Sequence, residues 1–348
     1  MAGRMIDFAA LGAQGNLAVF AGAAFVIALL GTRMAHLADA IADRTGLGEA
    51  LVGAVLLGAG TSISGIVTSV WSASAGYPSL SVANAIGGIA AQTAFLAIAD
   101  IFYRRVNLEH AAVSAVNLTQ SAILILLMAL PLLAYAAPPV ALWSVHPVTP
   151  VLVGVYLVGL RNAHRQKLEP MWRPRITEET HRDLADPGTR FGPDWWLFAQ
   201  FALLVMLVGL AGYAVGNSGA ALSAMLGISQ SVVGALMTAL VTSLPELVTT
   251  VAAVRAGAPQ LAIGGIIGGN MFDALFVAAS DIAYRDGSIY HAIGVRELFW
   301  YAIVIVMTTV LLAGLLQRER RGPAGIGWDS TLLLGLYLAA ASVQAALG

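Results

Sequence analysis

The 348-residue sequence predicts an all-α integral membrane protein of about ten transmembrane helices, arranged as two inverted-topology repeats of five helices. Three observations support this fold class. The chain is 58% apolar and only 11% charged, whereas soluble domains carry roughly 45–50% apolar and about 25% charged residues. Apolar stretches long enough for a span of about 20 residues recur along the chain. Two internal segments also repeat each other in register.

The composition excludes several classes of protein. A net charge of −1 argues against a nucleic-acid partner, which would require a basic surface. The absence of cysteine excludes disulfides, cysteine–zinc sites and thiol nucleophiles. The six histidines are scattered and no nucleophile motif is present, so we expect neither an enzyme nor a bound cofactor. The mixed polarity of residues 1–15 gives no sign of a cleavable signal peptide.

Hydrophobic stretches define the spans, and tight Gly/Pro turns such as 75–78 and 256–259 separate them. The ten spans are expected at 16–38, 48–75, 79–103, 112–136, 140–161, 195–218, 228–256, 259–283, 295–317 and 329–347.

One connection, residues 162–194, is long, rich in charges of both signs and punctuated by prolines. We interpret it as a solvated cytoplasmic tether, with a regulatory binding segment as the alternative. It separates a first half, residues 1–161, from a second half, residues 195–348.

The distribution of Lys and Arg in the short loops predicts the orientation. With the N-terminus outside, the outer segments hold only Arg4, Arg285 and Arg296. The inner loops hold the linker together with Arg44, Arg104, Arg105, Arg255, Arg318, Arg320 and Arg321. We therefore expect a multi-pass protein of the cell (inner) membrane with both termini on the outer face. Because five is odd, the two halves have opposite topology.

Residues 46–101 align with residues 227–282 without a gap, and 20 of the 56 positions are identical. The repeat offset is the constant difference in residue number that this alignment defines. Shared positions include Thr-Ser pairs, Gly-x-Pro turns and Gly-Gly pairs, which composition alone does not place in one register. Inverted repeats with broken helices are typical of secondary transporters, whose site lies at the midplane between the repeats.

Two acids lie deep in the second repeat. Glu246 precedes the Gly257 turn by 11 residues, about 16 Å of helix, and Asp273 follows Pro259 by 14 residues, about 21 Å. Half of the hydrocarbon core is about 15 Å, so both acids lie near the midplane. A charge there is costly and usually functional.

The surrounding residue types favour a hard cation. Glu246 and Asp273 supply carboxylates, and helix breaks near Ser64–Gly65 and Pro245 free backbone carbonyls. Further hydroxyls come from Thr61, Ser62, Thr242 and Ser243. An all-oxygen set suits Na⁺, Ca²⁺ or H⁺ rather than zinc or copper.

Each of these features has a structural alternative. A hydroxyl in a membrane helix often bonds back to the carbonyl four residues earlier, and the glycine pairs often serve helix packing. Asp100 and Asp281 lie near helix ends, where we expect them to face the membrane interface. Arg33 and His36 are interpreted as the inner end of the first span rather than as a gate.

The stretches 242–247 and 268–273 resemble the second α-repeat of the sodium/calcium exchanger family, part of the cation/Ca²⁺ antiporter superfamily. Residues 60–62 and 84–88 resemble the first α-repeat. The resemblance implies alternating access between the second, third, seventh and eighth spans, and exchange of Na⁺ or H⁺ for Ca²⁺. It implies ligand roles for Glu246, Thr242, Ser243, Thr61, Ser62, Asp273, its counterpart Gln92, and Asn270.

The first repeat departs from the family pattern. Gly65 stands at the acid position and Ser64 at the preceding proline. Gly88 and Gly269 stand where many members carry Ser, and Ile89 stands opposite Asn270. A site without the first-repeat acid should hold Ca²⁺ more weakly, and Gly65→Glu is expected to raise its Ca²⁺ affinity.

The sequence therefore predicts an antiporter that exchanges Na⁺ and/or H⁺ for Ca²⁺ or another cation, with inorganic cations and the bilayer as its partners. The alternative is a non-transporting, sensor-type membrane protein that keeps the fold. The transported ions, the oligomeric state and the occupant of the space beside Gly65 are left open.

Overall fold

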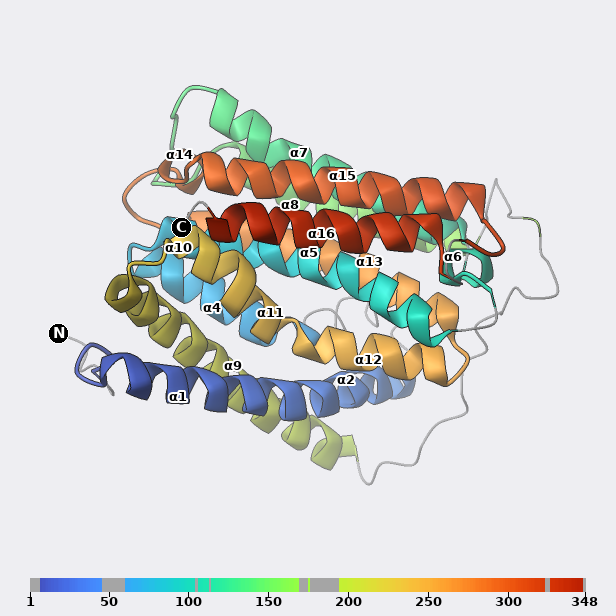
Figure 1. Ribbon diagram of the computed structural model, residues 1–348, viewed down its shortest axis with the longest axis horizontal. Helices are drawn as coiled ribbons and strands as arrows, with labels where there is room; N and C mark the ends of the chain where they lie inside the picture. The colour runs from blue at the N-terminus through green and yellow to red at the C-terminus, as the bar shows by residue number, and fades with distance from the viewer. Residues whose placement is uncertain are drawn as a thin grey trace.

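The computed structural model describes residues 7–45, 60–103, 106–112, 114–168, 175, 194–322 and 326–346. Within these ranges the chain forms helices and one isolated bridge between Leu142 and Val145 (Figure 1). The first half contains α1 (Gly12–Val26), η1 (Ile27–Gly31), α2 (Thr32–Thr45), α4 (Ile63–Ser74), α5 (Pro78–Phe102), α6 (Leu108–Ala111), α7 (Ala115–Ala136) and α8 (Val148–Leu168). The second half contains α9 (Asp194–Leu226), α10 (Gln230–Val232), η3 (Val233–Thr238), α11 (Ala239–Thr242), α12 (Leu244–Arg255), α13 (Pro259–Ala283), α14 (Ile289–Ala292), α15 (Val295–Gln317) and α16 (Trp328–Ala346).

The predicted all-α membrane fold is confirmed. Six described helices are long and apolar enough to cross a membrane, and α10–α11 with α12 forms a further span bent by 46°. The bend lies at Ser243, two residues before Pro245, which cannot donate a backbone hydrogen bond. The predicted break in the seventh span is therefore present.

Several predicted boundaries shift. The fifth span begins at Val148 rather than 140, because residues 137–147 form a loop in which Trp143 and Ser144 have positive φ. The fourth begins at Ala115 rather than 112, where the side chain of Ser114 accepts the N–H of Asn117. Helix α8 continues to Leu168, past the predicted start of the linker at 162. Most of that linker, and residues 48–59 of the second span, lie outside the described residues.

Helices α5 and α13 form the centre of the bundle. They pack against each other, and each also packs against α4 and α12 (Figure 1). Nearly every residue of α5 between Leu80 and Asp100 is buried. A helix covered on all sides needs no polar face, which explains why apolar and small residues occur on every side of α5.

Small residues allow two backbones to touch at one place. A Cβ on Gly87 of α5 would lie 2.5 Å from Cα of Ala235 in η3, and a Cβ on Gly234 would lie 2.7 Å from Cβ of Ala83. Gly87 in the first repeat therefore has the packing role expected of the glycine pairs. Gly265 does not have this role, because an added Cβ there would contact nothing within 4 Å.

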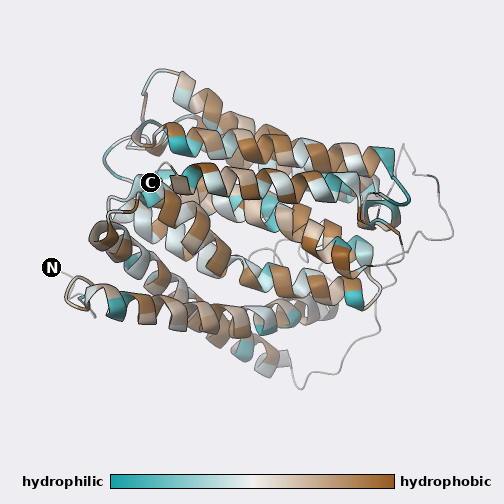
Figure 2. Ribbon diagram, viewed as in Figure 1, coloured by the Kyte–Doolittle hydropathy of each residue, from teal (hydrophilic) through white to brown (hydrophobic). Residues whose placement is uncertain are grey.

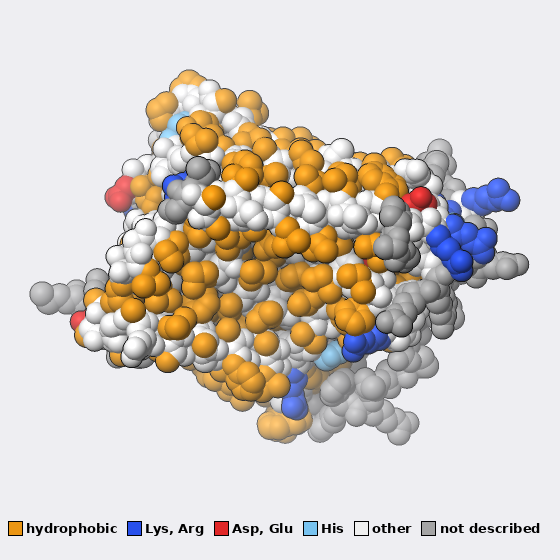
Figure 3. Space-filling view, in the orientation of Figure 1, with side chains coloured by type: hydrophobic (Ala, Val, Ile, Leu, Met, Phe, Trp, Pro, Cys, Tyr) orange, Lys and Arg blue, Asp and Glu red, His pale blue; other side chains and the backbone are white. Residues whose placement is uncertain are grey.

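Apolar residues predominate along the middle of the helices, and the most hydrophilic residues lie mainly near the helix ends (Figure 2). In the face shown in Figure 3, hydrophobic side chains cover the middle and most of the visible Lys and Arg atoms gather at one end. That end carries α6 and residues 318–322 and is called the α6 end; the α14 end carries α14 and the loop 137–147. Helix α1 begins and helix α16 finishes at the α14 end (Figure 1).

Candidate functional site

The two repeats place a helix break at the same position. Ser62 (φ −92°, ψ 4°) precedes α4, and Ser243 (φ −97°, ψ 7°) precedes α12. The first break has no proline, because Ser64 stands in its place, and the Ser64 hydroxyl donates to the carbonyl of Thr242 at 3.3 Å. The two breaks are thus hydrogen bonded to each other at the centre of the bundle.

Next to the breaks, four residues from both repeats form one hydrogen-bonded network. Asp273 of α13 accepts from the Ser62 hydroxyl at 2.6 Å and from Nε2 of Gln92 on α5 at 2.6 Å. Nε2 of Gln92 also lies 3.2 Å from the Ser243 hydroxyl. Ser62 corresponds to Ser243 in the repeat alignment, and Gln92 corresponds to Asp273. A pseudo-two-fold axis therefore passes through the network.

Glu246 lies in the first turn of α12 and is only 6% exposed. Its carboxylate accepts a hydrogen bond from the Thr61 side chain of the other repeat. The amino-terminal end of a helix carries a partial positive charge that stabilises a carboxylate there. The break before α12 therefore supports Glu246 electrostatically as well as positioning it.

Three buried oxygen atoms of the predicted ligands accept no hydrogen bond among the described residues. They are Oε2 of Glu246, Oε1 of Gln92 and Oδ1 of Asn270. The amide nitrogens of Gln92 and Asn270 are held by Asp273 and Thr93, at 2.6 and 2.9 Å, which fixes the direction of their oxygens. An unsatisfied buried acceptor costs about 1–3 kcal/mol. Oxygens of this kind are the ligands that hard cations prefer.

Of the eight predicted site residues, four form the network, Thr61 and Glu246 form a separate pair, and Asn270 and Thr242 bond to other residues. Ser62, Gln92, Ser243 and Asp273 are linked directly. The Thr242 hydroxyl instead bonds back to the carbonyl of Ala239 at 3.2 Å, the structural alternative for a helix hydroxyl. No group of three His, Cys, Asp or Glu side chains is placed to hold a metal ion in the described ranges.

The two glycines that replace serine lie beside this network. A Cβ on Gly88 would lie 3.4 Å from the Ser243 hydroxyl, and a Cβ on Gly269 would lie 3.6 Å from Oε1 of Gln92. Thr93, the partner of Asn270, was not among the predicted residues. Its only signal in the sequence is its position beside Gln92 on a buried helix.

Phe276 fills the space beside Gly65. A Cβ on Gly65 would lie 2.7 Å from Cε2 of Phe276, which is 3% exposed. A side chain, not an open space, therefore occupies the position of the first-repeat acid. The expectation that Gly65→Glu alone raises Ca²⁺ affinity is revised, because a glutamate there fits only if the Phe276 ring moves.

The remaining polar candidates lie away from this network. Asp100 and Asp281 are structural, as expected, but they are buried at the helix ends rather than exposed at the interface. Arg33 and His36 line a pocket of about 910 Å³ together with Trp196.

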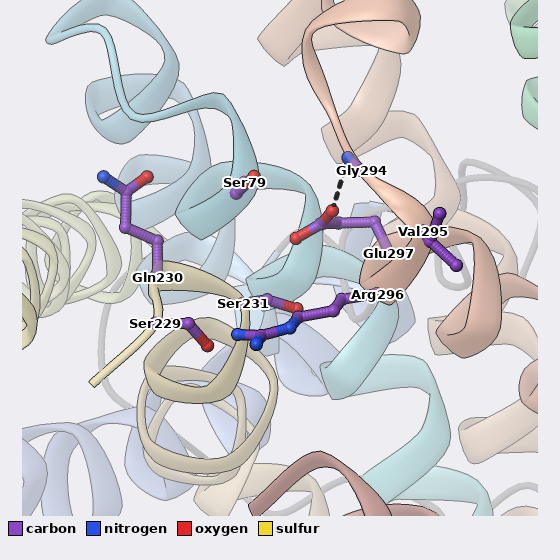
Figure 4. Close-up of a pocket in the computed structure, with 8 residues that line it drawn as sticks. All are labelled: Ser79, Ser229, Gln230, Ser231, Gly294, Val295, Arg296 and Glu297. Carbon is purple, nitrogen blue, oxygen red and sulfur yellow. Dashed lines mark hydrogen bonds between the residues drawn. The ribbon is translucent and has the colours of Figure 1, made fainter. Parts of the chain in front are cut away.

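A second pocket, of about 560 Å³, lies where the starts of α5, α10 and α15 meet (Figure 4). Oε2 of Glu297 accepts the N–H of Gly294 there at 2.8 Å. None of the predicted ligands lines this pocket. We therefore assign the candidate site to the buried network and not to either pocket.

The sequence matches the family model described as sodium/calcium exchanger protein over residues 15–160 and 196–346. It is 29% identical over 189 residues to inner membrane protein YrbG of Escherichia coli, covering 54% of each chain. It is 30% identical over 115 residues to sodium/calcium exchanger MaX1 of Methanosarcina acetivorans, covering 33% of this chain and 31% of that protein. The matching segments thus span about half or less of these relatives.

Solved exchanger structures share the fold over nearly the whole chain. A structure of the sodium-calcium exchanger NCX_Mj, soaked with 2.5 mM Na⁺ and 0.1 mM Ca²⁺, has a TM-score of 0.59 and 17% identity, covering 94% of this chain and 97% of that one. A crystal structure of the H⁺/Ca²⁺ exchanger CAX has a TM-score of 0.68 and 12% identity, covering 95% and 85%. At these identities the likeness concerns the fold alone.

Proposed function

This chain belongs to the sodium/calcium exchanger protein family, and we propose that it is a secondary active cation antiporter with its ion site between α4, α5, α12 and α13. The observation that carries the proposal is the set of three buried oxygens without hydrogen-bond donors, on Glu246, Gln92 and Asn270. They accompany a network in which every contact crosses from one repeat to the other.

The ligand chemistry narrows the cargo to hard cations. Glu246 and Asp273 provide two carboxylates, and the other ligands are neutral oxygens. Ca²⁺ takes 6–8 oxygens, whereas one Na⁺ or a proton on Glu246 needs fewer. We propose exchange of Na⁺ and/or H⁺ for Ca²⁺ or another cation. One relative is named a sodium/calcium exchanger and one structural neighbour an H⁺/Ca²⁺ exchanger. These names are consistent with either Na⁺ or H⁺ as the coupling ion.

The breaks at Ser62 and Ser243 suggest how access alternates. At Ser243 the break joins α11, which packs against α4, to α12, which packs against α13 and α2, so one segment can tilt while the other stays in place. A bound cation supplies the missing partner of Glu246 and neutralises charge at the midplane, which lowers the cost of moving the site between the two sides.

The test is reconstitution in liposomes with radioactive Ca²⁺, radioactive Na⁺ and a pH-sensitive dye read in parallel. Glu246→Gln keeps the shape of the side chain but removes its charge, so it should abolish counterflux. Glu297→Gln is the matched control, since Glu297 is also buried but lies outside the network. Counterflux of wild-type size in Glu246→Gln would contradict the site assignment.

The Phe276 ring beside Gly65 gives a specific reason to keep the sensor alternative. The ring takes the place of an oxygen ligand in the first repeat, and a site reduced in this way can bind a cation without exchanging it. That outcome would show as cation-dependent thermal stabilisation, lost in Glu246→Gln, with no counterflux of any of the three ions.

A further inference from the structure

The two ends of the bundle carry the same hydrogen-bonded arrangement, one copy from each repeat. At the end of α5, Asp100 accepts the N–H of Leu108 at 2.8 Å. At the end of α13, Asp281 accepts the N–H of Ile289, which occupies the matching position, at 3.0 Å. The other oxygen of each aspartate accepts an N–H from just before the last helix of the opposite half, at 2.9 and 2.8 Å. The aspartates thus join the two halves at both ends.

At the α14 end, a neutral hydrogen bond completes the arrangement. The Thr149 hydroxyl lies 2.6 Å from Asp281 and 2.9 Å from the hydroxyl of Tyr290. The Thr149 hydroxyl has one hydrogen, which it donates in a hydrogen bond to the carboxylate of Asp281. Tyr290 must therefore donate its own hydrogen to Thr149. A donor that stays neutral is required at this position, and the phenol supplies it.

At the α6 end, the same repeat offset places Glu109 where Tyr290 stands and Ser330 where Thr149 stands. Ser330 hydrogen bonds to Asp100, and its hydroxyl lies 3.4 Å from Oε1 of Glu109. Ser330 also has only one hydrogen. Both contacts are hydrogen bonds at the same time only when Glu109 carries a proton and donates it, as Tyr290 does at the other end.

A second difference between the two copies also favours a protonated Glu109. Asp329 occupies the place of Val148, and both Asp329 and Glu109 are at most 2% exposed. Oε2 of Glu109 and Oδ2 of Asp329 accept no hydrogen bond among the described residues. A Cβ on Gly327 would lie 3.4 Å from Oε2 of Glu109 and would also contact Oδ1 of Asp329. Two buried carboxyls converging in this way cannot both stay ionised at low cost.

The electrostatic surroundings also favour the protonated form of Glu109. Burial raises the pKa of Glu109 well above its usual range, and the charges of Asp329 and Asp100 raise it further. Among the described residues, the other titratable or charged groups packed around the pair are His110 on α6 and Arg318, Glu319 and Arg320 after α15.

We propose that Glu109 is a proton-binding site at the α6 end, separate from the ion site, and that it holds its proton at neutral pH by donating to Ser330 beside Asp329. Loss of this proton in an alkaline compartment places a third charge beside Asp100 and Asp329. The repulsion separates α6 from the start of α16. The site thus senses the pH on the α6 side of the membrane.

Thermal unfolding of the full chain in lipid nanodiscs, measured from pH 5 to pH 10, tests the proposal. Because Glu109 binds its proton more tightly in the folded state, its stabilisation is complete at acid pH and is lost as the pH rises through the folded-state pKa. The melting temperature of the wild type should therefore fall by about 2 °C or more as the pH becomes alkaline. Glu109→Gln should lack this decline, and its infrared spectrum should lack one neutral carboxylic acid band.

Asp329→Asn provides a second variant in case Glu109→Gln does not fold. It removes a negative charge that raises the pKa of Glu109, so the alkaline decline should end at lower pH than in wild type. Tyr290→Phe is the matched control at the other end and should keep the wild-type decline. An unchanged decline in both Glu109→Gln and Asp329→Asn would overturn the proposal. So would an alkaline decline in wild type that millimolar Na⁺ or Ca²⁺ reverses, since a metal ion would then be the ligand.

Discussion

Nε2 of Gln92 lies 2.6 Å from Oδ2 of Asp273, although the two residues belong to different halves of the chain and occupy the same place in the two repeats. The contact joins a neutral amide to a carboxylate across the pseudo-two-fold axis. Two residues of one repeat position have therefore become a donor and an acceptor. The two serines beside them are no longer equivalent either.

The asymmetry predicts different effects at the two serines. Ser62 donates to the Asp273 carboxylate at 2.6 Å, whereas Ser243 accepts from Gln92 at 3.2 Å. Hydrogen bonds to a charged group contribute about 1.5–3 kcal/mol and neutral ones about 0.5–1.5 kcal/mol. Ser62→Ala should therefore lower the free energy of unfolding in detergent by more than Ser243→Ala does. Equal losses in the two variants would argue against an ionised Asp273.

Adding an acid to the first repeat should require a second change. Gly65→Glu alone should destabilise the fold without raising Ca²⁺ affinity, because its Cβ would lie 2.7 Å from the Phe276 ring. Gly65→Glu with Phe276→Ala should bind Ca²⁺ more tightly than Phe276→Ala alone, since the site then gains a carboxylate. Calorimetric titration of the three variants measures this. A gain in the single variant Gly65→Glu would show that the ring moves aside freely.

The α14 end should weaken in acid. Burial lowers the pKa of His146, and the charge of Asp281 only partly opposes this shift. Nδ1 of His146 accepts the N–H of Val148 at 3.1 Å, a bond that protonation of Nδ1 abolishes. The folded state binds this proton less well than the unfolded state, so stability should fall as the pH drops below about 6.5.

His146→Gln should remove part of this acid-side decline in the melting temperature, measured between pH 7 and pH 5. His36→Gln is the control, because the His36 side chain is exposed. If His146→Gln follows the wild-type curve over this range, another group is responsible for the acid sensitivity.

Hydropathy located the spans because the bilayer requires about 20 apolar residues in a helix, a property of local sequence. The same reasoning misplaced the start of the fifth span at 140. Leu142 and Trp143 are apolar, yet they lie in a loop and are 68% and 92% exposed. Composition alone cannot distinguish apolar residues on a loop at the bundle surface from those of a span.

The internal repeat was the strongest information in the sequence. The repeat offset identified the two breaks, the pair Gln92 and Asp273, and the missing mate of Glu246. It also placed Phe95 and Phe276 at one position, but nothing in that identity indicated that Phe276 fills the space beside Gly65. The direction of a ring depends on its neighbours on other helices.

The sequence by itself determined the helical membrane class, the two-fold organisation and most of the buried polar residues between the two repeats, because span length, composition and repeat register are local or periodic properties. Only the tertiary structure decided that Thr242 turns back onto its own helix, that Asp273 is held by Ser62 and Gln92, and that Glu109 faces Asp329. These outcomes depend on contacts between helices far apart in the chain, where packing selects one hydrogen-bond partner among several that the sequence allows.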